Sequence, residues 1–421
     1  MRTMKPVTAT FLQLGLLTLT AVVQINSAIC AAGSPAQDSR KKPGFYTDDF
    51  RILPEVEATV YYDNNIYATK RLKEADWVAL ISPRLGVDSL WESHSLELDG
   101  GADFGRFTDN GSEDYDDYWL NGNAEFEIST DRQLYSSASY NHNHENRGSK
   151  EGGSLQIDEP TTYDLIDAQA GVNQKFDLTS IKAGLTYKQL DYDNVGSLYN
   201  DDRDRTESGF GVRLSYGLPS RSEIYTQAIL NRRDYGDRQD QFGYNRDSKG
   251  SNLIIGASRR YGKGNKLDAY LGQINQDYDD SRFDSVNLLI YGLDLRWYPS
   301  NKTKITAKVE RTQNETTEVG ASSYLYTYVD LQIDQKLGKD ILGYVNVNRG
   351  VADFQDVGRE DVSQSLGIGL KYYLNPLVMF SSSYSYIDND SNDTNRVYGV
   401  SESYDYKRGV IFFTVRARLV P

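Results

Sequence analysis

The chain has 421 residues and a formal net charge of −14, and it contains 32 Tyr and 35 Gly but a single Cys. The acidity argues against a nucleic-acid partner, because binding to phosphate backbones needs an excess of Lys and Arg. One Cys excludes a fold held together by disulfides. A mean hydropathy of −0.60 is compatible with a β-barrel in which every second strand residue faces water.

The N-terminal residues 1–31 have the organisation of a secretory signal peptide, with a short basic start, an apolar stretch at Val7–Val23 and small residues after it. We expect cleavage between Ala28 and Ala32. Cys30 lies in this stretch, but the residues before it do not match a lipid-attachment site, so we expect no lipid. Residues 32–50 are polar and predict a short periplasmic lead. Beyond the signal peptide, no apolar run reaches the roughly 18 residues of a membrane-spanning helix.

From residue 51 onward, apolar and polar residues alternate with the period of two that predicts β-strands. In Leu96–Phe104 the apolar residues occupy one face and three acidic residues occupy the other. In Phe413–Leu419 four apolar residues lie opposite Thr414 and two Arg. Charged faces of this kind suit either the solvated side of a soluble sandwich or the lumen of a membrane barrel. Aromatic residues gather near strand ends, as in the girdles of membrane barrels, although Tyr and Phe also favour strands in general.

The connections between the predicted strands alternate in length, and this alternation separates the two classes. Short connections are expected near residue 131 and at 177–180, 219–222, 262–265, 299–302, 338–340 and 375–376, and long ones at 63–75, 147–160, 193–205, 237–249, 312–323 and 388–403. Bacterial outer-membrane barrels have short periplasmic turns and long external loops. We therefore predict an all-β fold with one domain at 51–421, a transmembrane antiparallel β-barrel of about 18 strands (roughly 16–18).

Two segments, YYDNNIYAT at Tyr61–Thr69 and DWVALISPRLGV at Asp76–Val87, resemble the start of a β-barrel porin family found with exopolysaccharide and capsule synthesis systems. Members of that family typically open on an aromatic–Asp–Asn–Ile segment, and a strand with Ser-Pro and then Leu follows. Asp63–Ile66 and Ser82–Pro83 carry the match here. The resemblance implies an outer-membrane channel, a polysaccharide substrate and a periplasmic export partner. One departure is the C-terminal Pro421, since outer-membrane barrels usually end on an aromatic residue.

Catalytic and metal-binding chemistry is not expected. His142 and His144 would share a strand face, but no third metal ligand is evident near them. His94 lies in a predicted periplasmic turn, away from the outer surface where a hydrolytic Ser–His site would be expected. The segment Asp388–Gly399 has acidic residues at the spacing of a calcium loop, yet it has Asp and Gly where an EF-hand needs Gly and Glu. We predict no enzyme activity, no cofactor and no metal site, and leave open loose Ca²⁺ or Mg²⁺ bridging between acidic loops and lipopolysaccharide phosphates.

The lumen is the predicted functional region. By strand alternation, acidic side chains of the first strands and basic side chains of later strands face inward, and opposed walls of this kind would orient polar solutes. Inward aromatic residues, among them Tyr135 and Tyr344, could stack on sugar rings. The alternative is that the charges pair with one another and brace a wet interior. The predicted channel-lining residues are Glu97, Asp99, Asp103, Trp119, Glu125, Glu127, Lys182, Lys188, Arg213, Lys304, Lys308, Tyr326, Tyr328, Lys371, Arg416 and Arg418.

These observations lead to one functional hypothesis and two alternatives. The hypothesis is a channel in the outer membrane of a Gram-negative bacterium that passes an exopolysaccharide or capsule polymer without catalysis. The alternatives are a general or solute-specific uptake porin, and a non-conducting barrel that displays its acidic loops at the cell surface. The expected partners are outer-membrane lipid and lipopolysaccharide, the polysaccharide and a periplasmic export protein.

Overall fold

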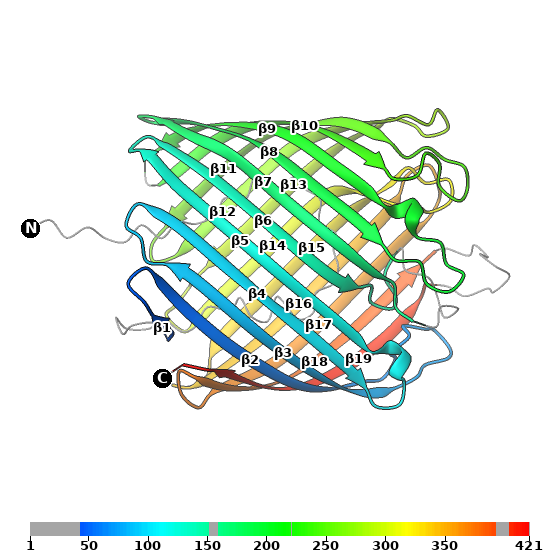
Figure 1. Ribbon diagram of the computed structural model, residues 1–421, viewed down its shortest axis with the longest axis horizontal. Coiled ribbons are helices and arrows are strands. Elements are labelled where there is room, and N and C mark those ends of the chain that lie inside the picture. The colour runs from blue at the N-terminus through cyan, green and yellow to red at the C-terminus, as the bar shows by residue number, and fades with distance from the viewer. Residues whose placement is uncertain (1–42, 151–158, 220, 393–403, 421) are drawn as a thin grey trace, which may run out of the picture.

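The computed structural model describes residues 43–150, 159–219, 221–392 and 404–420. One antiparallel sheet of eighteen long strands closes into a barrel, with a two-residue strand at its edge (Figure 1), which confirms the predicted fold class. The strands are β1 (Phe45–Tyr46), β2 (Phe50–Asp63), β3 (Asp76–Ser89), β4 (His94–Phe107), β5 (Tyr115–Ser129), β6 (Arg132–His144), β7 (Thr162–Phe176), β8 (Thr179–Tyr192), β9 (Arg205–Leu218), β10 (Ser222–Tyr235), β11 (Ser248–Tyr261), β12 (Asn265–Tyr278), β13 (Val286–Trp297), β14 (Thr303–Glu315), β15 (Ser323–Lys336), β16 (Ile341–Phe354), β17 (Glu360–Tyr373), β18 (Val378–Ser391) and β19 (Tyr406–Arg418). Two 3₁₀ turns, η1 (Gly111–Glu113) and η2 (Asp201–Arg203), are the only helices in the described ranges. None of the helices there is long and apolar enough to cross a bilayer.

The barrel closes because the last strand pairs with the first long one. Each long strand is antiparallel to its neighbours in the chain, and β19 pairs with β2. At this closing pair Thr414 lies opposite Thr59, and their hydroxyls are 2.9 Å apart. Closure removes the long free edges that an open sheet would expose.

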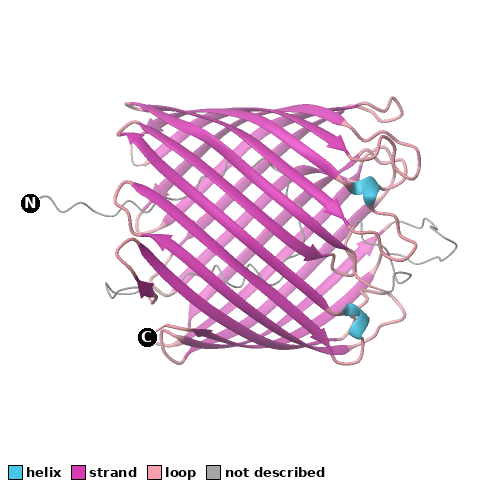
Figure 2. Cartoon of the chain, viewed as in Figure 1, coloured by secondary structure: helices cyan, strands magenta, loops and turns pink. Residues whose placement is uncertain are grey.

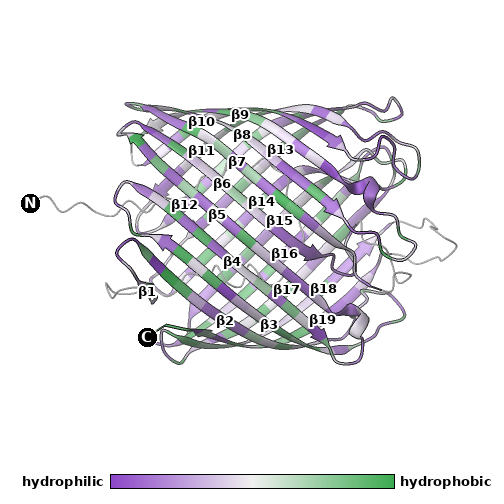
Figure 3. Cartoon of the chain, viewed as in Figure 1, coloured by the Kyte–Doolittle hydropathy of each residue, from purple (hydrophilic) through white to green (hydrophobic). Residues whose placement is uncertain are grey.

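Hydrophobic and hydrophilic residues alternate along the strands (Figure 3). Because successive side chains point to opposite faces, the exposed apolar residues share the outer face and most polar residues share the inner face. In β3, Trp77, Ile81 and Leu85 are about half exposed, at 47%, 47% and 49%, whereas Ser82 is buried on the opposite face. Because soluble proteins rarely leave so many large apolar side chains exposed, this pattern fits an outer face that contacts acyl chains.

The two ends of the barrel differ, and we call them the long-loop end and the short-turn end. The two 3₁₀ turns and the longer connections gather at the long-loop end, whereas the tight turns, the start of β2 and the end of β19 lie at the other (Figure 2). For example, only two residues separate β5 from β6, but β6 and β7 are joined by residues 145–161. The connections thus alternate as the sequence predicts. Which end faces the cell exterior stays a prediction.

The segment before the barrel is partly described. Within the predicted periplasmic lead, Phe45 and Tyr46 of β1 pair with Ile52 and Arg51 of β2. Residues 1–31, the predicted signal peptide, lie outside the described residues.

One hairpin departs from the regular wall. β14 pairs with β13 only as far as Arg311, which lies opposite Tyr291, so the last four residues of β14 are not paired with β13. Beyond that point the chain crosses the inner face of the wall: the Gln313 side-chain amide donates to the Tyr278 hydroxyl of β12 at 2.8 Å. Farther along, Glu315 reaches β10, four strands away. We call residues 312–323, the upper end of the β14–β15 hairpin, the in-folded hairpin.

Candidate functional site

The lumen contains a cavity of about 710 Å³ that extends along the barrel. Its lining includes Glu55 and Gly86 from the short-turn halves of β2 and β3, and Ile66 and Tyr404 from loops at the long-loop end. None of the described residues of β11, β12 or β13 lines it. On this side the in-folded hairpin contacts Tyr278 of β12, and Ile290 of β13 packs with Ile254 and Ile274 and is only 1% exposed.

The cavity is rich in aromatic residues with polar tips. Such side chains offer a flat apolar ring and a hydrogen-bonding group at the same site. Neutral amides and hydroxyls lie among them, including Asn121, Asn348 and Ser365. The aromatic lining residues with polar tips are Tyr61, Tyr115, Trp119, Tyr163, Tyr192, Tyr235, Tyr324, Tyr326, Tyr404 and Tyr406.

Several inward rings lie flat against the wall because a glycine faces them. A Cβ at Gly369 would sit 2.6 Å from Cε1 of Tyr344, so only glycine leaves room for this ring. A cation accompanies such rings: Lys371 lies 5.5 Å from the Tyr344 centroid. In the same way Lys182 lies 4.0 Å from the centroid of the Tyr135 ring. Lys371 and Lys182, both predicted lining residues, therefore pack against aromatic rings of the inner wall.

The structure brings only part of the predicted lining set to the main cavity. Five of these residues line it: Asp99, Asp103, Trp119, Lys188 and Tyr326. Two others, Arg416 and Arg418, lie at a small cavity at the short-turn end. Strand alternation puts the remainder on the inner face outside the main cavity: Glu97, Glu125, Glu127, Lys182, Arg213, Lys304, Lys308, Tyr328 and Lys371. Their role in a channel stays a prediction.

The expected separation into acidic and basic walls does not hold for many of the basic residues. Since the barrel closes between β19 and β2, Arg416 and Arg418 lie beside Glu55, with nitrogen–oxygen distances of 3.9 and 3.1 Å. Other predicted cations also pair locally: Lys304 with Asp334, Lys308 with Glu310, Lys188 with Asp167 and Arg213 with Glu223. Local pairing, the alternative interpretation, describes these residues. The alternation of residues in Phe50–Asp63 could have predicted from the sequence that Glu55 faces the lumen.

The motif that resembles the porin family has a structural role at the closing pair. Asp63 is fully buried and pairs with Arg408 of β19, and its carboxylate accepts a hydrogen bond from the backbone N–H of Asn65. The Asn64 side-chain oxygen accepts a 2.8 Å bond from the backbone N–H of Gly409. The Asn65 amide donates to the carbonyl oxygen of residue 407 at 2.9 Å. These side chains therefore continue the β19–β2 connection beyond the end of the strand ladder.

A buried ionic cluster anchors the in-folded hairpin. Glu315 and Glu207 side chains are each 3% exposed, and Arg233 lies between them at 2.5 and 3.9 Å. Arg205 adds a 3.0 Å contact with Glu207. Because a buried carboxylate without a partner is costly, each Glu requires its Arg, and the hairpin is held where both are satisfied.

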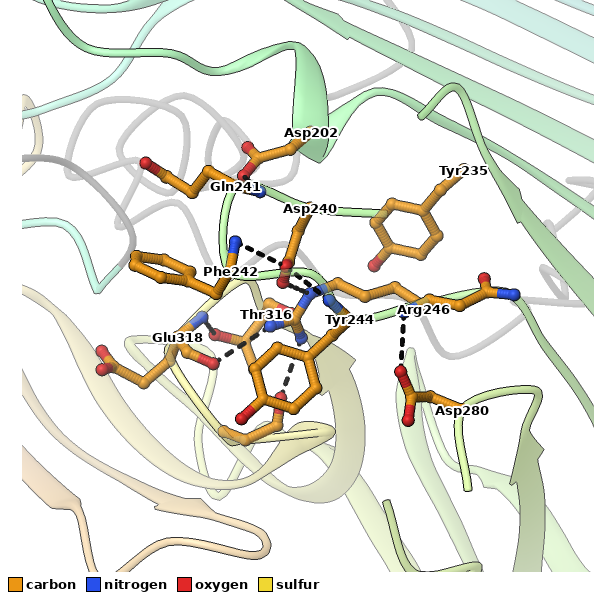
Figure 4. A network of polar contacts seen from close by, with 12 residues as sticks. Asp202, Tyr235, Asp240, Gln241, Phe242, Tyr244, Arg246, Asp280, Thr316 and Glu318 are labelled. Atoms are coloured by element: carbon orange, nitrogen blue, oxygen red, sulfur yellow. Dashed lines mark hydrogen bonds and ion pairs between the residues drawn. The ribbon is translucent and has the colours of Figure 1, made fainter. Parts of the chain in front are cut away.

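Arg246 connects two loops across the mouth of the barrel (Figure 4). Its side chain is 2% exposed, and its Nε donates to Asp240 at 2.7 Å. Its Nη1 donates to the carbonyl oxygens of Thr316 and Ala321 at 2.5 and 2.8 Å, and its Nη2 to that of Glu318 at 3.1 Å. The planar guanidinium thus joins the β10–β11 loop to the tip of the in-folded hairpin.

Arg359 extends the same connection to further loops. It forms ion pairs with Glu318 and, at 2.8 Å, with Asp361. Its guanidinium lies 4.0 Å from the ring centroid of Tyr404, and its Nη2 donates to the backbone oxygen of Lys150 at 3.2 Å. Loops that are far apart in the sequence therefore converge above the cavity.

Three loop carboxyls at the long-loop end have shifted pKa values. Burial raises the pKa of Asp202 and raises that of Asp204 to about 6. By contrast, the hydrogen bond from the Arg282 side chain holds the pKa of Asp280 well below its usual range.

The two histidines considered as metal ligands have other contacts. His142 Nδ1 lies 2.8 Å from an Asp164 oxygen, and His144 Nδ1 lies 3.0 Å from Asp117. The His144 ring also stacks on Tyr115 with centroids 3.9 Å apart. In the part of the chain that the structure describes, no group of three potential metal ligands is found.

Comparison with known proteins gives one match to a family. The family model described as "Putative beta-barrel porin 2" matches residues 41–419, nearly the whole chain. No curated protein matches the chain.

Solved structures match the chain at low similarity. OccK2 (OpdF) of Pseudomonas aeruginosa is 11% identical, with 90% of this chain and 100% of that chain covered and a TM-score of 0.47. OpdK of the same organism, crystallised with vanillate, is 11% identical, with 87% and 98% covered and a TM-score of 0.45. Its siderophore receptor PirA is 10% identical, with 90% and 81% covered and a TM-score of 0.42. These similarities are too low to indicate a function.

Proposed function

Because the chain belongs to this family of β-barrel porins and is a barrel of the Gram-negative outer membrane, we propose that it passes a polysaccharide, an exopolysaccharide or capsule polymer, across that membrane without a chemical step. The observation that carries the proposal is the aromatic lining of the cavity, nine Tyr and Trp119. The C–H faces of sugar rings are apolar, whereas their hydroxyls need hydrogen-bond partners. Rings beside amides and hydroxyls satisfy both requirements.

Local ion pairing supports a polymer substrate over a small ion. At the long-loop end Arg233 pairs with Glu315, and Arg205 pairs with Glu207. Paired charges give a weak field in the lumen, so the ring faces and neutral polar groups are left as the main contacts for a passing molecule. Many weak contacts along the cavity would let a chain of sugars slide without being trapped.

The test combines secretion and conductance. The gene is deleted, and the wild type or the double variant W119A/Y326A is restored at equal surface level. Each ring contact is worth about 0.5–1.5 kcal/mol, so we expect roughly tenfold weaker polymer binding and lower secretion. The matched control is Tyr372→Ala, which removes an outward-facing ring that is 44% exposed.

Two outcomes would replace the proposal. Normal secretion in the full deletion together with measurable single-channel conductance would make the protein an uptake porin. Normal secretion without any conductance would instead favour a barrel that displays its loops.

A further inference from the structure

Two arginines face the membrane on β14 and β16, the two strands on either side of β15. In β16 Val345 and Val347 point outward with 39% and 47% exposure, and alternation puts Arg349 in the same exposed series. In β14 the outward series of apolar residues ends at Arg311. Between them, Val329 of β15 faces outward with 42% exposure. In the strand ladders Val329 of β15 lies opposite Arg349, and Thr327 of β15 lies opposite Arg311. The two arginines therefore flank one strand on the outer wall.

Neither guanidinium has a protein counter-charge. None of the described residues forms an ion pair or a side-chain hydrogen bond with Arg311 or Arg349, and the Arg311 Nε is buried without a partner. Two other outward arginines near the long-loop end do have a counter-charge: Arg232 contacts Asp234 at 2.6 Å, and Arg106 contacts Asp116 at 2.6 Å. An unpaired arginine in an apolar setting requires an anion from its surroundings.

Their depth in the wall indicates which anion is available. Arg311 lies four residues before the end of β14, and Arg349 five before the end of β16, both toward the long-loop end. An arginine is costly at the middle of the bilayer and nearly neutral near its surface, where its long side chain can extend to the headgroups. Since outer-membrane barrels have their long loops outside the cell, we expect this end to lie in the outer leaflet. Phosphates of that leaflet are therefore within reach.

We propose that Arg311 and Arg349 form a binding site for the phosphate of a phosphorylated glycolipid in the outer leaflet of the outer membrane. A guanidinium presents planar N–H donors that match phosphate oxygens, and two of them on either side of β15 can hold one group from both sides. Below the phosphate, acyl chains would contact the outward valines, among them Val329 and Val347. The site is independent of the transported substrate.

The test measures retained lipid by native mass spectrometry of the whole purified barrel. The probes are bisphosphorylated lipid A, the same lipid without its phosphates, and phosphatidylglycerol. We expect the double variant R311Q/R349Q to retain phosphorylated lipid A at least about tenfold less than wild type. R311K/R349K, which keeps the charge but loses the planar donors, should retain an intermediate amount. The matched control is Arg232→Gln, an outward arginine that already has Asp234 as its partner.

The outcomes separate the occupants of this face. The proposal is overturned if the double variant and wild type retain equal amounts of lipid A, if phosphatidylglycerol is retained as well as lipid A, or if phosphate removal has no effect. It is also overturned if wild type binds no lipid but forms an oligomer that the double variant loses, because the face then binds a second copy. The mobility shift of unboiled samples checks that each variant is folded, and a lipid-facing Arg→Gln change should preserve it.

Discussion

Replacing Arg246 with Met should loosen the tip of the in-folded hairpin while leaving the barrel closed. The guanidinium makes four hydrogen bonds, to the Asp240 carboxylate and to the carbonyl oxygens of Thr316, Glu318 and Ala321. Methionine fills similar space but donates no hydrogen bond. Removing one partner of a buried ion pair costs about 3–5 kcal/mol. Each carbonyl left without a donor adds about 1–3 kcal/mol unless water replaces the lost bond.

The lost contacts join two loops, so the docking of the hairpin tip is weakened while the hydrogen bonds between strands stay intact. In the single variant the hairpin keeps its Glu315–Arg233 and Glu318–Arg359 ion pairs, so the tip should only loosen. Arg246→Met combined with Glu315→Gln should loosen it further, with the Arg359 contact remaining. The hairpin contacts the inner face of the wall at Arg233 of β10 and Tyr278 of β12, so its release should widen the lumen. We expect larger and noisier single-channel conductance in planar bilayers, and faster hydrogen exchange of the β15 amides near Ser323.

The matched control is Arg282→Met in the neighbouring loop. Arg282 also pairs with an aspartate, Asp280, but its side chain is 50% exposed. An exposed pair contributes about 0–1 kcal/mol, so conductance and exchange should stay at wild-type values. Equal conductance and equal exchange in the Arg246 and Arg282 variants would refute the idea that Arg246 holds the hairpin in the lumen.

Three further predictions concern pH, the lipid-facing surface and the rings on the wall. Burial raises the pKa of Asp204 from 3.8 to about 6, so the folded loop binds the proton more tightly, and its stability should fall as pH rises through this window; after correction for intrinsic rates, hydrogen exchange of that loop should be slower at pH 5 than at pH 7, and Asp204→Asn should remove the difference. Arginine at Val415, which is 41% exposed on the outer face, should destabilise the barrel by about 2–4 kcal/mol in urea unfolding if it lies near the bilayer midplane, whereas arginine at the inward Thr414 should cost far less; equal losses would show that the faces are assigned wrongly. Valine at Gly369 should displace the Tyr344 ring, since even a Cβ there would lie 2.6 Å from its Cε1, and near-ultraviolet circular dichroism should report the change; an unaltered spectrum would contradict the packing.

The strand number and the polarity of the two faces could be predicted because each strand carries its own signal. In β3 the outward residues Trp77, Ala79, Ile81, Pro83 and Leu85 follow one another at a period of two, and no distant residue is needed to interpret them. The length of each connection is likewise a local property. A closed barrel of about 18 strands then follows, since an even number of strands returns both ends to the same side.

Contacts between distant segments could not be predicted in this way. Arg418 is 363 residues from its partner Glu55, and only closure of the barrel brings them together. Arg246 and Arg359 look like ordinary loop cations in the sequence, because their burial depends on contacts with a hairpin about 70 and 40 residues away along the chain. The in-folded hairpin itself was predicted only as a long polar connection. Its inward direction is set by Arg233 on a strand four positions around the wall.

The arrangement of charges connects these long-range contacts to substrate choice. A channel that selects small ions needs charged side chains whose field extends into the lumen. At the long-loop end the charged side chains instead hold the structure together: Arg408 pairs with Asp63 at the closing strands, and Arg233 pairs with Glu315 at the hairpin. Aromatic rings line the same region, and cations lie over some of them, with Arg359 4.0 Å from the Tyr404 centroid and Arg203 3.9 Å from that of Tyr192. Discrimination there should therefore depend on ring faces and hydroxyl contacts, which suits a chain of sugars better than an ion.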